Sequence, residues 1–98
     1  MPLEENDLDT LSCEIALRPR GAPSLLEVVP AIRASRREPG ALVVEFDGAA
    51  ADTLAAAVEA ERLCCAGIGW ELEREPLRLR IVAAPAQLDV FAAFLAPQ

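Results

Sequence analysis

The chain carries three cysteines, and two of them are consecutive. Cys64 and Cys65 lie in the stretch ERLCCAGIGW at residues 61–70, and Cys13 lies near the start of the chain. Packing does not demand a cysteine doublet, because Ala-Leu or Val-Ala would fill the same space. Thiolates are soft ligands that select Hg(II), Cu(I) or Zn(II) over Mg(II) or Ca(II). The three thiols therefore predict a binding site for a thiophilic metal ion, provided that Cys13 lies close to the doublet in the folded chain.

The absence of histidine excludes several other kinds of chemistry. Ser-His and Cys-His nucleophile pairs and histidine-based zinc sites cannot form within this chain. A redox or thiol-transfer enzyme is also disfavoured, because reactive cysteines have lowered pKa values at helix N-termini or beside cations. The doublet is expected at a helix C-terminus, whose partial negative charge opposes thiolate formation, and the chain has no C-x-x-C motif. We therefore favour a binding protein over an enzyme and expect no cofactor apart from a metal ion.

The main alternative is that the three cysteines are buried and have no function. Free cysteine is among the most buried residue types and packs as a small hydrophobic side chain. The chain would then be a structural or protein-interaction domain, and a homodimer could form through an exposed sheet edge or the alanine-rich helix at residues 50–65. The distance from Cys13 to Cys64 and Cys65 separates the two hypotheses.

Charge and composition narrow the class of partner. Sixteen acidic residues against nine arginines give a formal net charge of −7, which disfavours nucleic acid and anionic lipid as partners. The apolar runs are far shorter than the ~20 residues of a membrane span. Residues 1–10 are acidic and polar, unlike the basic and then apolar start of a secretion signal. We therefore expect a cytoplasmic protein, in which thiols stay reduced.

Four stretches carry the residue patterns of strands. Alternating or β-branched residues predict strands at residues 11–17, 41–46, 68–75 and 77–83. The last two are expected to form a hairpin with its turn at Glu75-Pro76. The alternating glutamates of this hairpin are typical of a solvated strand face that pairs with Arg78 and Arg80, rather than of acid–base catalysts. Trp70, which follows two glycines, is expected to be a core anchor beside the cysteine helix.

Three stretches carry the patterns of helices. The first begins at a predicted capping box, Ser24 with Glu27, and its apolar stripe runs to Ile32, although Pro30 should kink or split it. The second, at about residues 50–65, is rich in alanine, leucine and glutamate, which are strong helix formers. The third begins at a proline near residue 85, a residue type that favours the first helical position.

The order β-α-β-α-β-β-α predicts one α+β domain at residues 11–98, preceded by a disordered acidic tail at residues 1–10. A single-layer mixed sheet of about four strands would carry the helices mainly on one face. Cys13 falls on the core-facing side of the first strand. Cys65 falls on the core-facing stripe of the second helix, and Cys64 falls at the edge of that stripe. Such a fold could bring the three thiols together between sheet and helix.

The segments LSCEIAL, EAERLCCAGIGWELE and LRLRIVAAPAQLDVFAAFL together resemble a family of small uncharacterised bacterial proteins. That family shares an A-C-T-L-like N-terminal segment, a central E-R-x-C-C-P-F-x-x-F/W-x-L stretch and a C-terminal strand and helix. Some of its members are associated with mercury or heavy-metal resistance. The resemblance implies that Cys13, Cys64 and Cys65 are the site residues. The chain departs from the pattern at Ala66, where proline usually follows the doublet, and at Glu14, where threonine usually follows the first cysteine.

Overall fold

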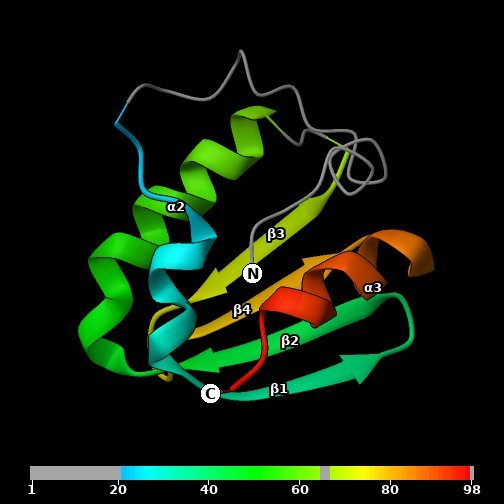
Figure 1. Ribbon diagram of the computed structural model, residues 1–98, viewed down its shortest axis with the longest axis horizontal. Helices are drawn as coiled ribbons and strands as arrows, with labels where there is room; N and C mark the ends of the chain where they lie inside the picture. Colours follow the sequence, from blue (N-terminus) through cyan, green and yellow to red (C-terminus); the bar gives the residue numbers. More distant parts are fainter. Residues whose placement is uncertain (1–20, 65–66, 98) are drawn as a thin grey trace.

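The computed structural model describes residues 21–64 and 67–97 of the chain. These residues form, in chain order, the 3₁₀ helix η2 (Leu25–Ala31), strands β1 (Ile32–Glu38) and β2 (Ala41–Phe46), the 3₁₀ helix η3 (Gly48–Ala50), helix α2 (Ala51–Cys64), strands β3 (Gly69–Glu73) and β4 (Arg78–Val82), and helix α3 (Pro85–Phe94). The four strands form one sheet, and the helices lie over one of its faces (Figure 1). This arrangement confirms the predicted α+β fold. The strand predicted at residues 11–17 and the tail predicted at residues 1–10 lie outside the described residues.

The sheet is built from two hairpins that meet at its centre. Its strand order is β1-β2-β4-β3, and every pair of neighbours is antiparallel. The turn of the β3–β4 hairpin contains Glu75-Pro76, as predicted. Because β2 and β3 are each antiparallel to β4, they run parallel to each other, and α2 connects them. A helix that joins two parallel strands returns along the sheet, so the end of α2 at Cys64 lies at the same end of the sheet as the start of β3 (Figure 1).

The structure corrects the prediction for the first helix. The apolar stripe predicts that this helix includes Ile32, but η2 ends at Ala31 and Ile32 begins β1. Pro30 lacks an N–H and disfavours continuation of the helix, and the backbone at Ile32 is extended (φ −69°, ψ 126°). The polar residues that follow form an edge strand, which pairs with β2 through a turn at Gly40 (φ 74°). Glycine adopts such a positive φ at little steric cost.

The starts of the helices agree with the sequence prediction. The N–H of Leu26 donates to Oγ of Ser24 at 3.1 Å, and the N–H of Ser24 donates to the Glu27 carboxylate at 2.6 Å, which confirms the capping box. Helix α2 covers most of the predicted second helix, and α3 begins at Pro85. None of the described helices is long and apolar enough to cross a membrane.

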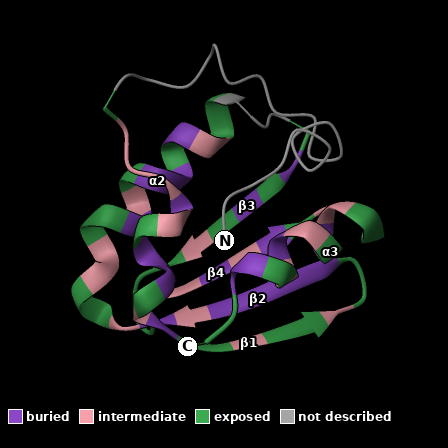
Figure 2. Cartoon of the chain, viewed as in Figure 1, coloured by how far each residue is buried: buried purple, intermediate pink, exposed green. Residues whose placement is uncertain are grey.

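The core lies between the helices and the sheet (Figure 2). Its largest fully buried side chains come from both layers: Leu42, Leu54, Leu79, Ile81, Leu88, Phe91 and Leu95. Strand β2 is buried on both faces, because Val43, which faces away from the helices, is only 4% exposed. Its two cross-strand partners are Arg36 on β1 and Arg80 on β4. The aliphatic parts of long arginine side chains can cover apolar surface in this way.

Candidate metal site at the end of helix α2

The structure places one of the three predicted metal ligands. Cys64 is the last residue of α2, whereas Cys13 and Cys65 lie outside the described residues. The approach of Cys13 to the doublet therefore stays a prediction. Within residues 21–64 and 67–97, no group of three or more His, Cys, Asp or Glu residues could hold a metal ion. A three-thiolate site at this end of α2 thus depends on Cys13 and Cys65 in addition to Cys64.

The burial of residues along α2 shows which side of the helix packs in the core. Leu54 and Val58, which the apolar stripe predicts to face the core, are buried. Ala57 and Ala60, which the sequence places at the edge of that stripe, are buried as well. At about 100° per residue, position 64 falls on the same side of the helix as these two alanines. The burial of these four residues therefore agrees with the core-facing stripe that the sequence predicts for this helix.

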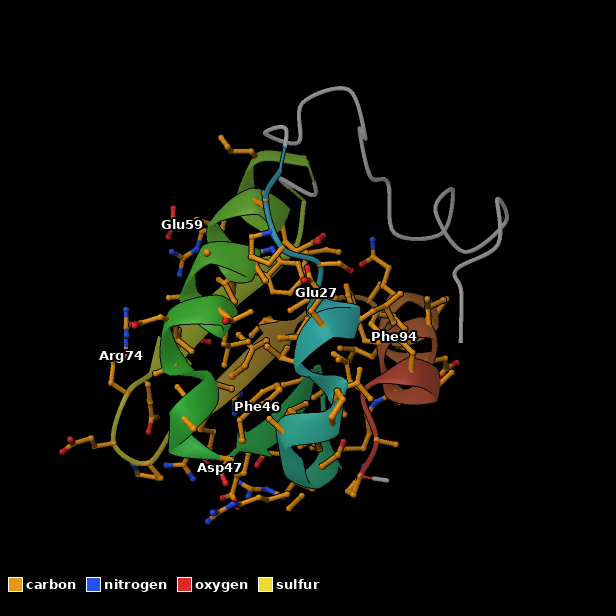
Figure 3. The ribbon with its side chains drawn as sticks, turned by 60° about the vertical axis from the view of Figure 1, so that its left-hand side comes forward. Glu27, Phe46, Asp47, Glu59, Arg74 and Phe94 are labelled. Atoms are coloured by element: carbon orange, nitrogen blue, oxygen red, sulfur yellow. The ribbon has the colours of Figure 1, made fainter. Side chains whose placement is uncertain are left out.

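Arg62 connects the last turn of α2 to the start of β3. Its Nη2 donates a hydrogen bond to the carbonyl oxygen of Trp70 at 2.9 Å. Its Nη1 pairs with the carboxylate of Glu59, one turn earlier on the solvent side of the helix (Figure 3). The chain between Arg62 and Trp70 contains both Cys64 and Cys65. This hydrogen bond therefore links the last turn of α2 directly to the start of β3.

Sequence patterns did not reveal this role of Arg62. A hydrogen bond from a side chain to a backbone carbonyl requires no particular residue type at the acceptor, so it leaves no mark in the sequence of β3. The basic charge in the last turn of α2 is the one signal that points to Arg62, because it complements the partial negative charge of the helix C-terminus.

Trp70 anchors the start of β3 in the core, as predicted. It is 7% exposed, and its ring meets that of Phe91 on α3 edge-to-face, with centroids 5.4 Å apart and planes at 85°. Its indole Nε1 is buried without a hydrogen-bond partner, alone among the buried side-chain nitrogen and oxygen atoms of the described residues. A buried donor without a partner is uncommon in proteins and needs a structural or functional explanation. This observation singles out the same junction between α2 and β3.

The glutamates of the β3–β4 hairpin are partners of arginines. Nη2 of Arg78 pairs with Glu73 at 2.9 Å, and Nε of Arg80 lies 3.5 Å from the Glu71 carboxylate. These contacts confirm the predicted cross-strand pairs. The alternating glutamates of β3 are therefore explained by ion pairs on the solvated face of the sheet, and no catalytic role is needed to account for them.

Glu38 is a further member of this charged face that the sequence did not predict, because β1 itself was not predicted. Its carboxylate accepts hydrogen bonds from Nε of Arg36 at 2.9 Å and from Nη1 of Arg80 at 2.6 Å. These two bonds, that from Arg36 first, lower the pKa of Glu38 below its ordinary value. Glu38 therefore joins β1 to β4 across the intervening strand β2.

Comparison of the chain with protein-family models, curated proteins and solved structures finds no match. The resemblance to bacterial proteins with a cysteine doublet therefore stays a prediction. A functional assignment depends on the three cysteines and on the geometry of the α2–β3 junction.

Proposed function

We propose that this protein binds a thiophilic metal ion, Hg(II), Cu(I) or Zn(II), through the thiolates of Cys13, Cys64 and Cys65. The observation that supports the proposal is that Cys64, the first residue of the doublet, ends α2, whose last turn is linked to β3 by the hydrogen bond from Arg62 to the Trp70 carbonyl. A ligand whose main chain belongs to a helix loses less conformational freedom on binding than a ligand on a free chain. The protein would act as a cytoplasmic buffer, carrier or sensor accessory in heavy-metal handling, without catalysis.

The ligand set favours soft metal ions that accept few ligands. Three thiolates in a chain without histidine form a sulfur-only site, which suits Hg(II) and Cu(I). Zn(II) takes four ligands in structural sites, so a zinc complex would need a further ligand such as the carboxylate of Glu61. A bound cation also displaces the thiol protons, which overcomes the partial negative charge at the C-terminus of α2.

A metal titration of the reduced, full-length protein tests this function. Hg(II), Cu(I) and Zn(II) are added stepwise, and the thiolate-to-metal absorption is followed in the wild type and in Cys13→Ser, Cys64→Ser and Cys65→Ser. We expect a single equivalent of Hg(II) or Cu(I) to saturate the wild type. Each substitution should weaken binding by more than about tenfold, because even the loss of an outer-shell partner typically costs that much.

The variant that lacks all three thiols serves as the control for this titration. It measures adventitious binding by the carboxylates of a chain with a net charge of −7. Wild-type binding no tighter than that of this variant would show that the thiols form no metal site.

A second candidate function is a protein-interaction domain in which the cysteines are buried and inert. One observation favours it: Leu63, beside the doublet, is 54% exposed, whereas most large hydrophobic side chains in proteins are buried. An exposed leucine at the end of the alanine-rich helix offers an apolar contact to a second copy of the chain.

Two measurements distinguish this candidate from the metal site. Sedimentation of the wild type should show a dimer that Leu63→Ser weakens, with Val82→Ser as the matched control, because Val82 is a similarly exposed (40%) aliphatic residue on β4. Labelling of the thiols should also be slow until the protein unfolds. A monomer with rapidly labelled thiols contradicts the interaction domain.

A further inference from the structure

The outer side of β1 is an unpaired sheet edge in the part of the chain that the structure describes. There, β1 pairs with β2 alone. The turn at residues 39–40 makes Glu38 and Ala41 a hydrogen-bonded pair. Because hydrogen-bonded and non-hydrogen-bonded pairs alternate along an antiparallel ladder, the main-chain groups of Ser35 and Arg37 point away from β2. Such a row of N–H and C=O groups is a template for a further strand.

The other outer strand of the sheet, β3, is in a different situation. The carbonyl oxygen of Trp70 on β3 accepts a hydrogen bond from Arg62 on α2, and α2 packs against this strand. Strand β1 lies at the opposite side of the sheet (Figure 1). Among the described residues, no side chain forms a hydrogen bond with the main chain of β1. The edge of β1 is therefore the more accessible of the two for strand addition.

The side chains of β1 form a basic strip on an acidic protein. The strand contains Arg33, Arg36 and Arg37, which are three of the nine arginines of a chain with a net charge of −7. Their side chains are 68%, 57% and 40% exposed. The strand has one acidic residue, Glu38. An incoming strand would thus meet more positive than negative charge along this edge.

The three arginines keep donors for a further carboxylate. Each forms an ion pair within the chain, with Asp47, Glu38 and Asp89 in order of sequence. A guanidinium has five N–H groups, and the hydrogen bonds within the described residues use one or two of them in each of the three arginines. Exposed ion pairs of this kind are worth little. A second carboxylate can therefore share or replace these partners at small cost.

The positions of the arginines indicate the pattern of the partner. Arg36 is opposite Val43, on the face without helices, and Arg37 is opposite Leu42, on the face that the helices cover. Successive side chains of an added strand also alternate between the two faces. Consecutive acidic residues would place one carboxylate beside Arg36 and the next beside Arg37. Acids at every second position would reach one face only.

A second copy of β1 does not fit the same edge. Two β1 strands side by side would bring six arginines together with two glutamates. Like charges on opposing strands destabilise the pairing, and charged edges of this kind prevent a protein from pairing with itself. The basic strip therefore selects a strand of opposite charge.

We propose that the outer edge of β1 binds an extended segment of a partner protein that contains consecutive acidic residues, which adds to the sheet as a further strand. Main-chain hydrogen bonds would supply the affinity of such strand addition, and the arginines would supply its specificity. This inference is independent of the metal site, since it uses neither the cysteines nor the end of α2.

The test is a titration of the ¹⁵N-labelled, full-length protein with a capped peptide about as long as the seven residues of β1. The peptide carries a run of consecutive glutamates flanked by threonine and valine. We expect its addition to shift the amide resonances of β1, most strongly those of Ser35 and Arg37. Two control peptides separate the contributions: one has glutamine in place of glutamate, and the other is N-methylated at alternate residues, which removes main-chain donors and keeps the charge.

Protein variants test the basic strip itself. Arg33→Gln and Arg36→Gln should each weaken peptide binding about two- to fivefold, the range of exposed ion pairs. Arg74→Gln is the matched control, because Arg74 is 59% exposed and lies outside β1, so its affinity should equal that of the wild type. All three side chains are largely exposed, and thermal unfolding of each variant without peptide checks that it folds.

Four results would overturn the proposal. The first is the absence of shifts in β1 at millimolar peptide, and the second is equal binding of the glutamine peptide. Equal binding of the N-methylated peptide would show adhesion of charge without strand addition. Sedimentation that shows a dimer strengthened by Arg36→Gln would assign this edge to a second copy of the chain.

Discussion

Asp47 interacts with two neighbours through one carboxylate. Its Oδ1 accepts a hydrogen bond from the N–H of Ala49 at 2.9 Å, which caps η3, and its Oδ2 pairs with Nη2 of Arg33 at 3.0 Å. Both contacts favour the ionised form. The bond from Ala49, followed by that from Arg33, lowers the pKa of Asp47 below its ordinary value of 3.8. The turn that leads into α2 thus depends on the charge of this side chain.

Acid should therefore weaken the fold in a way that depends on Asp47. A carboxyl whose pKa is lowered in the folded state stabilises the fold at pH values above its ordinary, unfolded pKa, and the contribution is lost as the pH falls towards the folded value. Asp47→Asn can still cap the helix but cannot ionise. Urea midpoints between about pH 6 and pH 2 should fall more steeply in the wild type than in Asp47→Asn, and parallel curves would contradict this role.

At the scale of the elements, β1 is a strand that the sequence pattern does not predict. Its burial runs from one buried residue, Ile32, to exposed and half-buried residues, so it has no apolar alternation to detect. Edge strands commonly carry charged residues. Such a strand can be identified from its pairing with a neighbouring strand, here β2, but not from its own sequence. The strands at 41–46 and 78–82 were predictable because each buries apolar side chains in the core.

The β1–β2 hairpin should depend on Gly40 for a conformational reason alone. An added Cβ would meet no atom within 4 Å, but φ is 74°, so Gly40→Ala should destabilise the fold by about 1–2 kcal/mol. Gly48→Ala is the matched control, because its Cβ would also meet nothing within 4 Å and its φ is not in the positive region. Urea denaturation should show Gly48→Ala unchanged or slightly more stable. Equal losses in both variants would exclude the conformational explanation.

The helix end and the three thiols could be predicted from sequence, but the surroundings of the doublet could not. The order of elements along the chain is compatible with several strand orders, and the insertion of β4 between β2 and β3 is decided by tertiary packing. The bond from Arg62 to Trp70 forms between α2 and β3, which pack against each other in this arrangement, and no residue pattern marks it. The residue types therefore predicted thiol ligands, whereas the hydrogen bond between α2 and β3 became visible only in the folded structure.

At the scale of the whole molecule, β2 is the strand on which both faces of the sheet depend. The helices cover Leu42 and Val44, and the arginines of the charged face flank Val43. Removing two methyl groups from a fully buried valine costs about 2 kcal/mol through lost burial and a residual cavity. We therefore expect the arginines of the charged face to stabilise the fold more by shielding Val43 from water than by forming ion pairs.

Val43→Ala tests this expectation by denaturant unfolding. We expect a loss of about 2 kcal/mol, although Val43 lies on the face without helices. Val82→Ala is the matched control on the same face of the neighbouring strand, where the side chain is 40% exposed, and it should change stability by less than about 0.5 kcal/mol. Similar, small losses in both variants would show that the arginines do not shield Val43.

The strand order also has a consequence for synthesis. Residues 64 and 65 leave the ribosome before β4, the strand that must enter between β2 and β3, and before Phe91, against which Trp70 packs. A nascent chain that ends before β4 therefore contains β2 and β3 without the strand that joins them. Translation therefore has to pass Phe91 on α3 before Trp70 can pack against it and the start of β3 can take its final place in the core.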